Sequence, residues 1–348
     1  MYDINSLFCG EPGTTFIISE LSANHNQDFD LAVQSIRAMK KAGANAVKLQ
    51  TFHPESMTLD SDLPWFQTRL GTLWEGRRLF DLYKEAETPW AWHKKLQEVA
   101  TEEGLIFFSS PFDASAVDFL ESLDLSLYKI ASPEITDIPL IEKVAWTGKP
   151  VILSSGIATE ADINLAVNTI RNTGNENIAI LKCTTAYPAP FEEINLQTIP
   201  DIRERFGVIP GLSDHTLGVS IPIAAVALGA KIIEKHFILD RALGGLDSAF
   251  SLEPSEFAAM VTAIRQVELS LGSVNYELTM TTKSSRKAAR SLFAVDNINQ
   301  GEVFSSNNVR SLRPGLGLHP QYLSSIIGKK ATVAIVKGSP LEWGMVDK

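Results

Sequence analysis

The feature that most constrains the fold of this chain is a regular alternation of short apolar runs with segments of helical period over residues 15–236. The runs are FIIS (16–19), AVKLQ (46–50), LIFFS (105–109), LYKIA (127–131), VILSS (151–155), IAILKC (178–183), GVIPGLS (207–213) and KIIEKHF (231–237). Short runs rich in β-branched residues are typical of strands buried on both faces of a parallel sheet. Eight strand–helix units in succession predict a closed (β/α)8 TIM barrel.

The segments between the runs have the period of amphipathic helices. After the first run, Ala32, Ile36 and Met39 recur at i, i+4 and i+7, and Asp30 is the expected N-cap. After the fifth run, Thr159 is the expected N-cap. An open, doubly wound sheet is the alternative fold. It would place a glycine-rich phosphate turn after the first strand, where this chain has SELSANHNQ.

The pattern changes after residue 272. Residues 273–287, SVNYELTMTTKSSRK, are polar and predict a linker. From 288 to 348 the chain has short strand-like runs and turns, without a helix of barrel length. We therefore expect a catalytic barrel domain in 1–272, a linker in 273–287 and a small β-rich domain in 288–348.

Composition restricts the class of protein. A hydrophobic content of 45% and a charged content of 21% indicate a soluble globular chain with a sizeable core. No apolar run approaches the roughly 20 residues of a membrane span, and Cys9 and Cys183 make no disulfide framework. The net charge of −10 argues against nucleic acid as the main partner. We expect a cytoplasmic enzyme that binds neither membranes nor nucleic acid.

Polar side chains collect at the carboxyl ends of the runs, where a barrel of this kind has its active site. Those ends carry Glu20, Lys48, Gln50, Ser110, Lys129, Ser132, Glu134, Ser154, Thr185, Tyr187, Ser213, His215, Glu234 and His236. Burying an ammonium group without an anion is costly. Lys48 and Lys129, at the ends of the second and fourth runs, therefore predict a shared anion. Hydroxyls of neighbouring serines could complete a phosphate or carboxylate site.

Two histidines end adjacent strands. His215 and His236 are flanked by Asp214 and Glu234, and this pattern predicts a two-histidine metal site with open positions. Such a site could activate a carbonyl as a Lewis acid. Lys235 should face the other side of its strand, because successive side chains alternate, and is expected to be a structural charge.

The sequence leaves the role of two features of the loops undecided. Residues 65–92 are rich in aromatic side chains, which either form a small core of their own or wall one side of the barrel mouth. Asp247, in the last loop, is either a turn residue or a ligand for a pair of sugar hydroxyls.

A resemblance joins these observations. The ordered motifs FIISELSANHNQ, AVKLQTF, LYKIASPE, VILSSGIATE, LKCTTAYPAP, GLSDHTLG, IIEKHF and RSLFA…LRPGLG resemble the nonulosonate (sialic acid) synthase family over nearly the whole chain. Within it, LWEGRRLFDLYKEAETPWAWH and SLRPGLGLHP are similar to the pseudaminic acid branch. The resemblance implies a TIM barrel followed by an antifreeze-like (SAF, β-clip) domain, exchanged between the chains of a homodimer.

The implied reaction is a metal-dependent condensation of phosphoenolpyruvate with an acylated amino sugar. In the pseudaminic branch the sugar is 2,4-diacetamido-2,4,6-trideoxy-L-altrose, and the products are pseudaminic acid and phosphate. N-acetylneuraminate or legionaminic acid synthesis is the alternative within the family. A Schiff-base aldolase that uses Lys129 or Lys48 as its nucleophile, and a non-catalytic carbohydrate- or ice-binding protein, are the alternatives outside it.

The resemblance also implies residue roles. His215 and His236 would hold Mn2+ or Mg2+. The phosphoenolpyruvate ligands would be Lys48, Lys129, Ser132, Ser154 and Ser213, with Ser110 and Thr185 nearby. The sugar would be oriented by Glu20, Gln50, Glu134, Tyr187 and Asp247, and Arg313 would reach it across the dimer. Glu234 is the candidate catalytic carboxylate, with Glu20 and Lys129 as further catalytic candidates.

Overall fold

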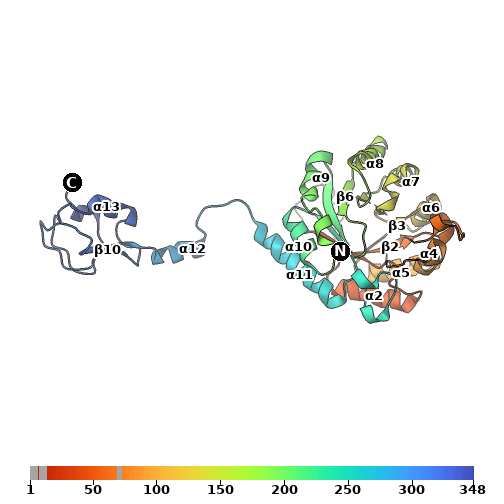
Figure 1. Ribbon diagram of the computed structural model, residues 1–348, viewed down its shortest axis with the longest axis horizontal. Coiled ribbons are helices and arrows are strands. Elements are labelled where there is room, and N and C mark those ends of the chain that lie inside the picture. Colours follow the sequence, from red (N-terminus) through yellow and green to blue (C-terminus); the bar gives the residue numbers. More distant parts are fainter. Residues whose placement is uncertain (1–6, 8–13, 69–72) are drawn as a thin grey trace. The chain divides into compact units, whose positions relative to one another are not determined.

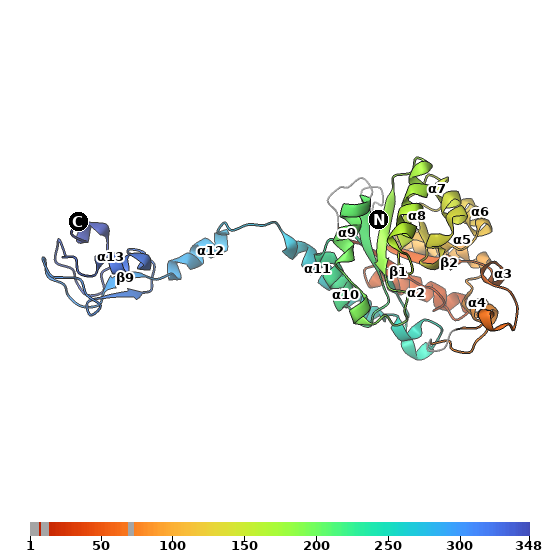
Figure 2. The same ribbon diagram turned by 45° about the horizontal axis from the view of Figure 1, so that its top comes forward.

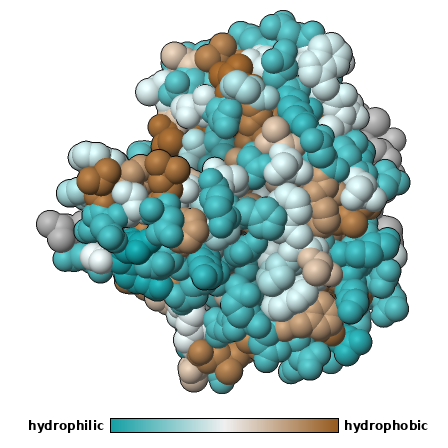
Figure 3. Space-filling view, turned by 90° about the vertical axis from the view of Figure 1, so that its right-hand side faces the viewer, coloured by the Kyte–Doolittle hydropathy of each residue, from teal (hydrophilic) through white to brown (hydrophobic). Residues whose placement is uncertain are grey.

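The computed structural model describes residues 7, 14–68 and 73–348, so Cys9 lies outside the described residues. The chain forms two compact units, Met1–Gly272 and Ser273–Lys348. Among the described residues, no helix combines the length and apolarity that a membrane crossing requires. On the face shown in Figure 3, hydrophilic residues predominate and apolar residues form separate small patches.

The first unit is a closed barrel of eight parallel strands in sequential order, which confirms the predicted TIM barrel. The strands are β1 (Phe16–Glu20), β2 (Ala46–Thr51), β3 (Ile106–Pro111), β4 (Tyr128–Ile130), β5 (Val151–Ser154), β6 (Ile178–Cys183), β7 (Ile209–Asp214) and β8 (Ile232–His236). Glu20 pairs in register with Lys48 of β2 and with His236 of β8. The carboxyl ends of these three strands therefore lie at one level.

Helices surround the barrel (Figures 1 and 2). They are α2 (Phe29–Lys41), α3 (Pro54–Met57), α4 (Leu79–Ala86), α5 (Trp90–Glu102), α6 (Ala114–Ser122), α7 (Ile138–Ala145), α8 (Glu160–Asn172), α9 (Thr198–Phe206), α10 (Ser220–Ala227) and α11 (Pro254–Leu271). Their apolar stripes and the outer faces of the strands form one continuous core.

The N-caps of two helices can be compared with those that the sequence predicts. Thr159 caps α8 as predicted, and Asp162 returns the hydrogen bond in a capping box. The prediction for α2 is wrong by two residues, because Asp28 rather than Asp30 is the N-cap. The Asp28 carboxylate accepts hydrogen bonds from the backbone N–H groups of Asp30 and Leu31. Asp30 instead lies in the first turn, where its charge favours the helix dipole.

The second unit has a small core of its own, which includes Leu292, Phe304 and Leu341. Strands β9 (Ser291–Ala294) and β10 (Val309–Leu312) pair antiparallel, and short helices α12 (Met280–Ser285) and α13 (Leu323–Ile326) accompany them. The segment expected to be a linker thus contains a short helix, α12. Most of the second unit consists of turns and isolated bridges, as its sequence pattern predicts.

Candidate active site

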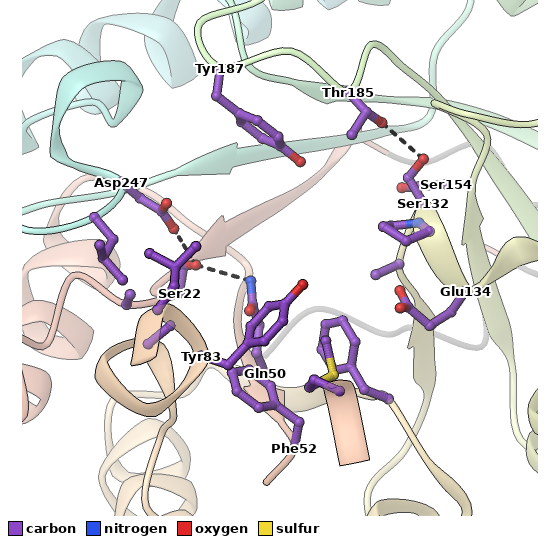
Figure 4. A pocket seen from close by; sticks show the side chains of 18 of the residues that line it. Ser22, Gln50, Phe52, Tyr83, Ser132, Glu134, Ser154, Thr185, Tyr187 and Asp247 are labelled. Carbon is purple, nitrogen blue, oxygen red and sulfur yellow. Dashed lines mark hydrogen bonds between the residues drawn. The ribbon is translucent and has the colours of Figure 1, made fainter. Parts of the chain in front are cut away.

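A cavity of about 610 Å³ opens at the carboxyl ends of the strands (Figure 4). Most of the predicted site residues line it, namely Lys48, Gln50, Lys129, Ser132, Glu134, Ser154, Thr185, Tyr187, Ser213, His215, Glu234, His236 and Asp247. Glu20 and Ser110 are fully buried beside it without being part of its lining. The barrel thus brings together side chains from all eight strands or the loops that follow them.

Four buried charges form the floor of the site. The Nζ atom of Lys48 lies 2.7 Å from Oε2 of Glu20 and 3.4 Å from Oε1 of Glu234, and Lys129 Nζ lies 3.8 Å from the same Glu234 oxygen. Two ammonium groups therefore face two carboxylates. The protein itself supplies the anions that the buried lysines need, so their burial alone does not require a bound anion.

The protonation of these groups follows from burial and neighbouring charge. Burial would raise the pKa of Glu234, but Lys129 and Lys48 hold it below its usual value, so this carboxylate is ionised. Burial raises the pKa of Glu20 in spite of Lys48, and it lowers the pKa of Lys129 in spite of Glu234. Of the two carboxylates, Glu234 is thus the stronger candidate for a charged catalytic group.

Hydroxyl groups form a second cluster, which we call the hydroxyl cradle: Ser132, Ser154 and Thr185. The Thr185 hydroxyl donates to Ser132 Oγ at 3.0 Å, and Ser154 Oγ is buried without a hydrogen-bond partner. Gly156 makes this approach possible, because a Cβ atom there would lie 2.0 Å from Thr185 Oγ1 and 2.6 Å from Ser132 Oγ. Among the described residues no group pairs with the Ser154 hydroxyl, which lines the same cavity as two lysines and therefore suits an anionic ligand.

Two further serines lie beside the buried charges. Ser213 donates to Oε1 of Glu234 at 3.1 Å, and its side chain belongs to the cavity lining. The Lys48 ammonium donates to Ser110 Oγ at 3.4 Å below the cavity. Ser110 can therefore orient Lys48, whereas Ser213 can orient Glu234.

The two histidine rings lie side by side, with centroids 5.2 Å apart and planes tilted by 59°. His215 Nδ1 lies 3.2 Å from the carbonyl oxygen of Thr184, which can only accept, so Nδ1 carries a proton. Burial would lower the pKa of His215, but Cys183, Asp214 and the Thr184 carbonyl raise it above its usual value. His236 Nδ1 is buried without a hydrogen-bond partner, 3.6 Å from Asp247 Oδ2. Burial and the neighbouring His215 lower the pKa of His236 well below its usual value, so its ring is neutral.

Metal ligation needs neutral imidazoles with a free lone pair, which His236 offers directly and which His215 offers once its Nε2 is unprotonated. Within the described part of the chain, no group of three or more His, Cys, Asp and Glu side chains is arranged to hold a metal ion. A metal at the histidine pair would therefore take further ligands from substrate and water. The metal site stays a prediction.

Asp214 and Lys235 belong to the other face of the sheet. Lys235 Nζ lies 2.6 Å from Asp214 Oδ2, and both side chains are buried. The expectation that Lys235 is a structural charge is confirmed. The expectation that Asp214 flanks the metal site is wrong, because the side-chain alternation that sends Lys235 outward does the same for Asp214.

The side of the cavity that the sequence assigns to a sugar holds Gln50, Tyr187, Asp247 and an unpredicted residue, Ser22. Gln50 Nε2 donates to Ser22 Oγ at 3.0 Å, and Ser22 Oγ donates to Asp247 Oδ2. The ring of Tyr187 packs against His215 at 4.7 Å. The sequence pattern carries no signal for Ser22, because its inward direction depends on a left-handed backbone, with φ of 48°.

The loop between β2 and β3 both forms a small core and walls the cavity. Trp90 stacks on His53 at 4.2 Å and on Phe119 at 4.5 Å, as a packing residue would. Trp74 and Tyr83 instead line the cavity (Figure 4 labels Tyr83). Apolar residues that the sequence did not single out complete this wall, namely Phe52, Met57, Leu79, Leu82 and Phe112.

Glu134 faces the cavity near this wall. Its Oε2 is buried without a hydrogen-bond partner, and burial raises the pKa of the carboxyl to about 7. A carboxyl with this pKa can donate or accept a hydrogen bond at neutral pH. Arg313 belongs to the second unit, directly after β10, where its side chain is exposed. Its action on a partner chain stays a prediction.

Comparisons with known proteins show the family of this chain. The model of the NeuB family matches residues 35–276, and that of the SAF domain matches residues 289–347. The pseudaminic acid synthase of Helicobacter pylori is 48% identical over 95% of this chain and 98% of its own length. That of Campylobacter jejuni serotype O:2 is 46% identical over 94% of this chain and 96% of its own length.

A solved structure extends the similarity to the fold. The N-acetylneuraminic acid synthetase of Leptospira borgpetersenii is 32% identical, with a TM-score of 0.70, and the match covers 78% of this chain and 90% of that one. The relatives are named as synthases, which supports the prediction of an enzyme. The resemblance inferred from the ordered motifs is confirmed: the chain belongs to the NeuB family and carries a C-terminal SAF domain.

Proposed function

We propose that this protein is a cytoplasmic pseudaminic acid synthase. It condenses phosphoenolpyruvate with 2,4-diacetamido-2,4,6-trideoxy-L-altrose and releases pseudaminic acid and phosphate. Two relatives of that name, at 46% and 48% identity over nearly the whole chain, support this function. The observation that carries it is one cavity in which two buried lysines, a hydroxyl cradle and a pair of histidines converge.

Phosphoenolpyruvate takes the polar side of this cavity. Lys48 and Lys129, with the hydroxyl cradle and Ser213, hold its phosphate and carboxylate groups. The four buried charges already balance one another, so Glu20 keeps Lys48 in place rather than contacting the substrate directly. Preorganised cations of this kind bind an anion without first having to leave water.

The acceptor sugar takes the opposite side. Gln50, Tyr187 and Asp247 supply its polar contacts, and Glu134 can bind either a donor or an acceptor there. The apolar wall, with Tyr83 and Met57, faces the less polar part of the sugar. A 6-deoxy sugar with two acetamido groups carries three methyl groups that such a wall can contact.

The histidine pair would hold a divalent metal, Mn2+ or Mg2+. His215 has Nε2 available for it, because its Nδ1 donates to the Thr184 carbonyl, and His236 has a neutral ring. The ion would supply Lewis-acid polarisation of the open-chain sugar's aldehyde. Asp247, 3.6 Å from His236 Nδ1, would orient that ring as a carboxylate partner of a metal-binding histidine does.

The protein's residues then guide three bond changes. C3 of phosphoenolpyruvate attacks the aldehyde carbon, which forms the new C–C bond and leaves positive charge at C2. The ionised Glu234 stabilises this charge and takes a proton from the water that adds to C2. The proton that Glu234 takes balances the one that the former aldehyde oxygen gains as it becomes a hydroxyl. The tetrahedral carbon then expels phosphate by cleavage of its C–O bond, and the C2 hydroxyl gives its proton to the departing phosphate as the C2 ketone forms. Lys48 and Lys129 balance the charge of the departing phosphate.

The test is phosphate release from phosphoenolpyruvate with a panel of acylated amino sugars, with and without a chelator. We expect turnover with the diacetamido trideoxy-altrose, loss of turnover with the chelator and recovery with Mn2+ or Mg2+. A preference for N-acetylmannosamine, or for the acceptor of legionaminic acid synthesis, would overturn the pseudaminic assignment. Activity that survives the chelator, with a borohydride-trapped adduct on Lys129 or Lys48, would indicate a Schiff-base aldolase.

We also propose a homodimer in which the second unit of each chain covers the partner's cavity. Exposed apolar residues on four different loops at the barrel mouth support this proposal, namely Ile157, Phe191, Leu217 and Leu243. The second unit carries an exposed Leu316 close in sequence to Arg313. Covering these residues would bury apolar surface and bring Arg313 to the sugar.

A further inference from the structure

Ser22 joins three residues of the sugar side and has no role in the chemistry described above. Its side chain is buried at the cavity wall, directly after β1. Its hydroxyl accepts a hydrogen bond from Gln50 Nε2 at 3.0 Å and donates one to Asp247 Oδ2. Its backbone N–H donates to Glu20 Oε1 at 3.0 Å. Figure 4 shows Ser22 between Gln50 and Asp247.

The backbone of Ser22 indicates that its side chain is needed. Its φ of 48° lies in the left-handed region, which is unfavourable for residues with a Cβ atom. Asn26, Asp124 and Asn195 share this region, which asparagine and aspartate tolerate, and so does Gln27. Glycine would form the same turn at position 22 without strain. Serine adds only its hydroxyl to this turn. A strained backbone conformation that is kept beside a cavity points to a functional role for the residue.

The hydrogen bonds of Gln50 then have a defined direction. The Ser22 hydroxyl has one proton, which goes to Asp247, so it must accept from Gln50. The Gln50 amide also donates to Glu20 Oε1, at 3.4 Å. Both N–H bonds of the Gln50 amide are thus directed away from the ligand. Its carbonyl oxygen is the atom left for the sugar.

Asp247 is oriented in the same way. Its Oδ2 receives the Ser22 hydroxyl and faces His236 Nδ1 at 3.6 Å. The Ala23 backbone N–H also donates to this carboxylate, and Oδ1 has no side-chain partner among the described residues, so a lone pair of Oδ1 is left for a ligand. The hydrogen bonds of Ser22 therefore leave the Gln50 carbonyl oxygen and the Asp247 carboxylate as two neighbouring hydrogen-bond acceptors. Their complement is a sugar with two neighbouring donors, such as a hydroxyl group beside an acetamido N–H.

We propose that Ser22 is a positioning residue of the sugar subsite. Its hydroxyl fixes the Gln50 carbonyl and Asp247 Oδ1 as a pair of acceptors for a hydroxyl and an amide N–H of the acceptor sugar. This inference rests on the proposed function. It predicts an effect on the acceptor sugar and not on phosphoenolpyruvate, because the Ser22 hydroxyl contacts Gln50 and Asp247 and none of the proposed phosphoenolpyruvate ligands.

The test uses the full-length Ser22→Gly and Ser22→Ala variants. We expect KM for the sugar to rise by about 10- to 100-fold, the range for lost supporting hydrogen bonds, and KM for phosphoenolpyruvate to stay unchanged. Ser22→Gly should unfold at no lower temperature than the wild type, because the turn is relieved. Ser19→Ala is the matched control. Ser19 is a buried serine of β1 whose hydroxyl has no partner, and its variant should behave as wild type.

A double variant separates positioning from direct contact. If Ser22 acts through Asp247, adding Ser22→Gly to Asp247→Asn should change the sugar KM little beyond the effect of Asp247→Asn alone. An unchanged sugar KM in Ser22→Gly would overturn the inference. Equal losses for both substrates together with a lower melting temperature would also overturn it, since Ser22 would then be structural.

The wild-type protein separates this test from the test of the function. If wild type does not use the diacetamido trideoxy-altrose, the proposed function fails, and the Ser22 variants are compared on the acylated amino sugar that it does use. If wild type uses the proposed sugar and the variants match it, the inference about Ser22 alone is wrong.

Discussion

Gly156→Ala should selectively damage the binding of phosphoenolpyruvate. Gly156 follows β5, and its backbone has none of the positive φ angles that exclude alanine, so the effect is steric. The added Cβ would lie 2.0 Å from Thr185 Oγ1, 2.6 Å from Ser132 Oγ and 3.0 Å from Cys183 Sγ. Because non-bonded heavy atoms pack at about 3.5–4.0 Å, the Thr185 hydroxyl has to rotate away. The hydrogen bond between Thr185 and Ser132 in the hydroxyl cradle would then be lost.

The size of the effect follows from the hydrogen bonds that the variant can no longer make. A hydrogen bond to a charged ligand contributes about 1.5–3 kcal/mol. Loss of one such bond from the hydroxyl cradle corresponds to a rise of about 10- to 150-fold in KM for phosphoenolpyruvate. The overpacked site should also reduce the free energy of unfolding by about 1–3 kcal/mol. Gln50 and Asp247, two of the proposed sugar contacts, lie on β2 and in the loop after β8, so KM for the sugar should change less than KM for phosphoenolpyruvate.

The assay is initial-rate phosphate release with each substrate varied in turn, accompanied by urea denaturation. Gly344→Ala is a matched control, because a Cβ atom at Gly344 would have no other atom within 4 Å. If Gly156→Ala folds and keeps the wild-type KM for phosphoenolpyruvate, the hydroxyl cradle is not the anion site, and the assignment of Ser132, Ser154 and Thr185 is wrong.

Three further predictions test the dimer, the metal and the pH dependence. Mixing inactive Lys129→Ala and Arg313→Ala chains should restore about a quarter of wild-type activity if Arg313 acts across a two-fold dimer; no recovery would contradict this. His236→Ala should abolish Mn2+ binding in calorimetry, whereas His319→Ala should retain it. Burial raises the pKa of Glu134 to about 7 from 4.5, so stability linked to this carboxyl is present below pH 4.5 and is lost as pH rises through 7. Glu134→Gln should therefore raise the free energy of unfolding by up to about 3 kcal/mol at pH 8 and much less at pH 5; equal gains in urea titrations at both values would contradict it.

The barrel can be predicted because its strands follow local patterns. Each apolar run is short, bounded by turn residues and followed by a helical period, so the sequence predicts all eight strands in their order. The same order places strand ends together, which is why Lys48, Lys129 and the histidine pair can be assigned to one cavity from the sequence alone. Helix ends are harder to predict. Asp28 and Asp30 can each cap α2, and the choice depends on whether the helix begins two residues earlier or later.

The rest of the site depends on backbone direction and on pairing, which no local pattern records. The left-handed backbone that sends Ser22 inward cannot be read from the letters ELSAN. Glu20 can be assigned to the mouth, but its pairing with Lys48 at 2.7 Å depends on how β1 and β2 align. Asp214 precedes a cavity histidine and yet faces outward. In each case three-dimensional context decides between two directions that the sequence leaves open.

The ion pair of Asp214 and Lys235 has a consequence for the histidines. These two residues are partners in the ladder between β7 and β8, and each immediately precedes a cavity histidine. A slip of one residue between the strands would break the pair and carry one imidazole out of the cavity. The spacing of the two rings is thus set from the opposite side of the sheet, beneath the helices. A mutation there could weaken metal affinity without changing any atom that meets metal or substrate.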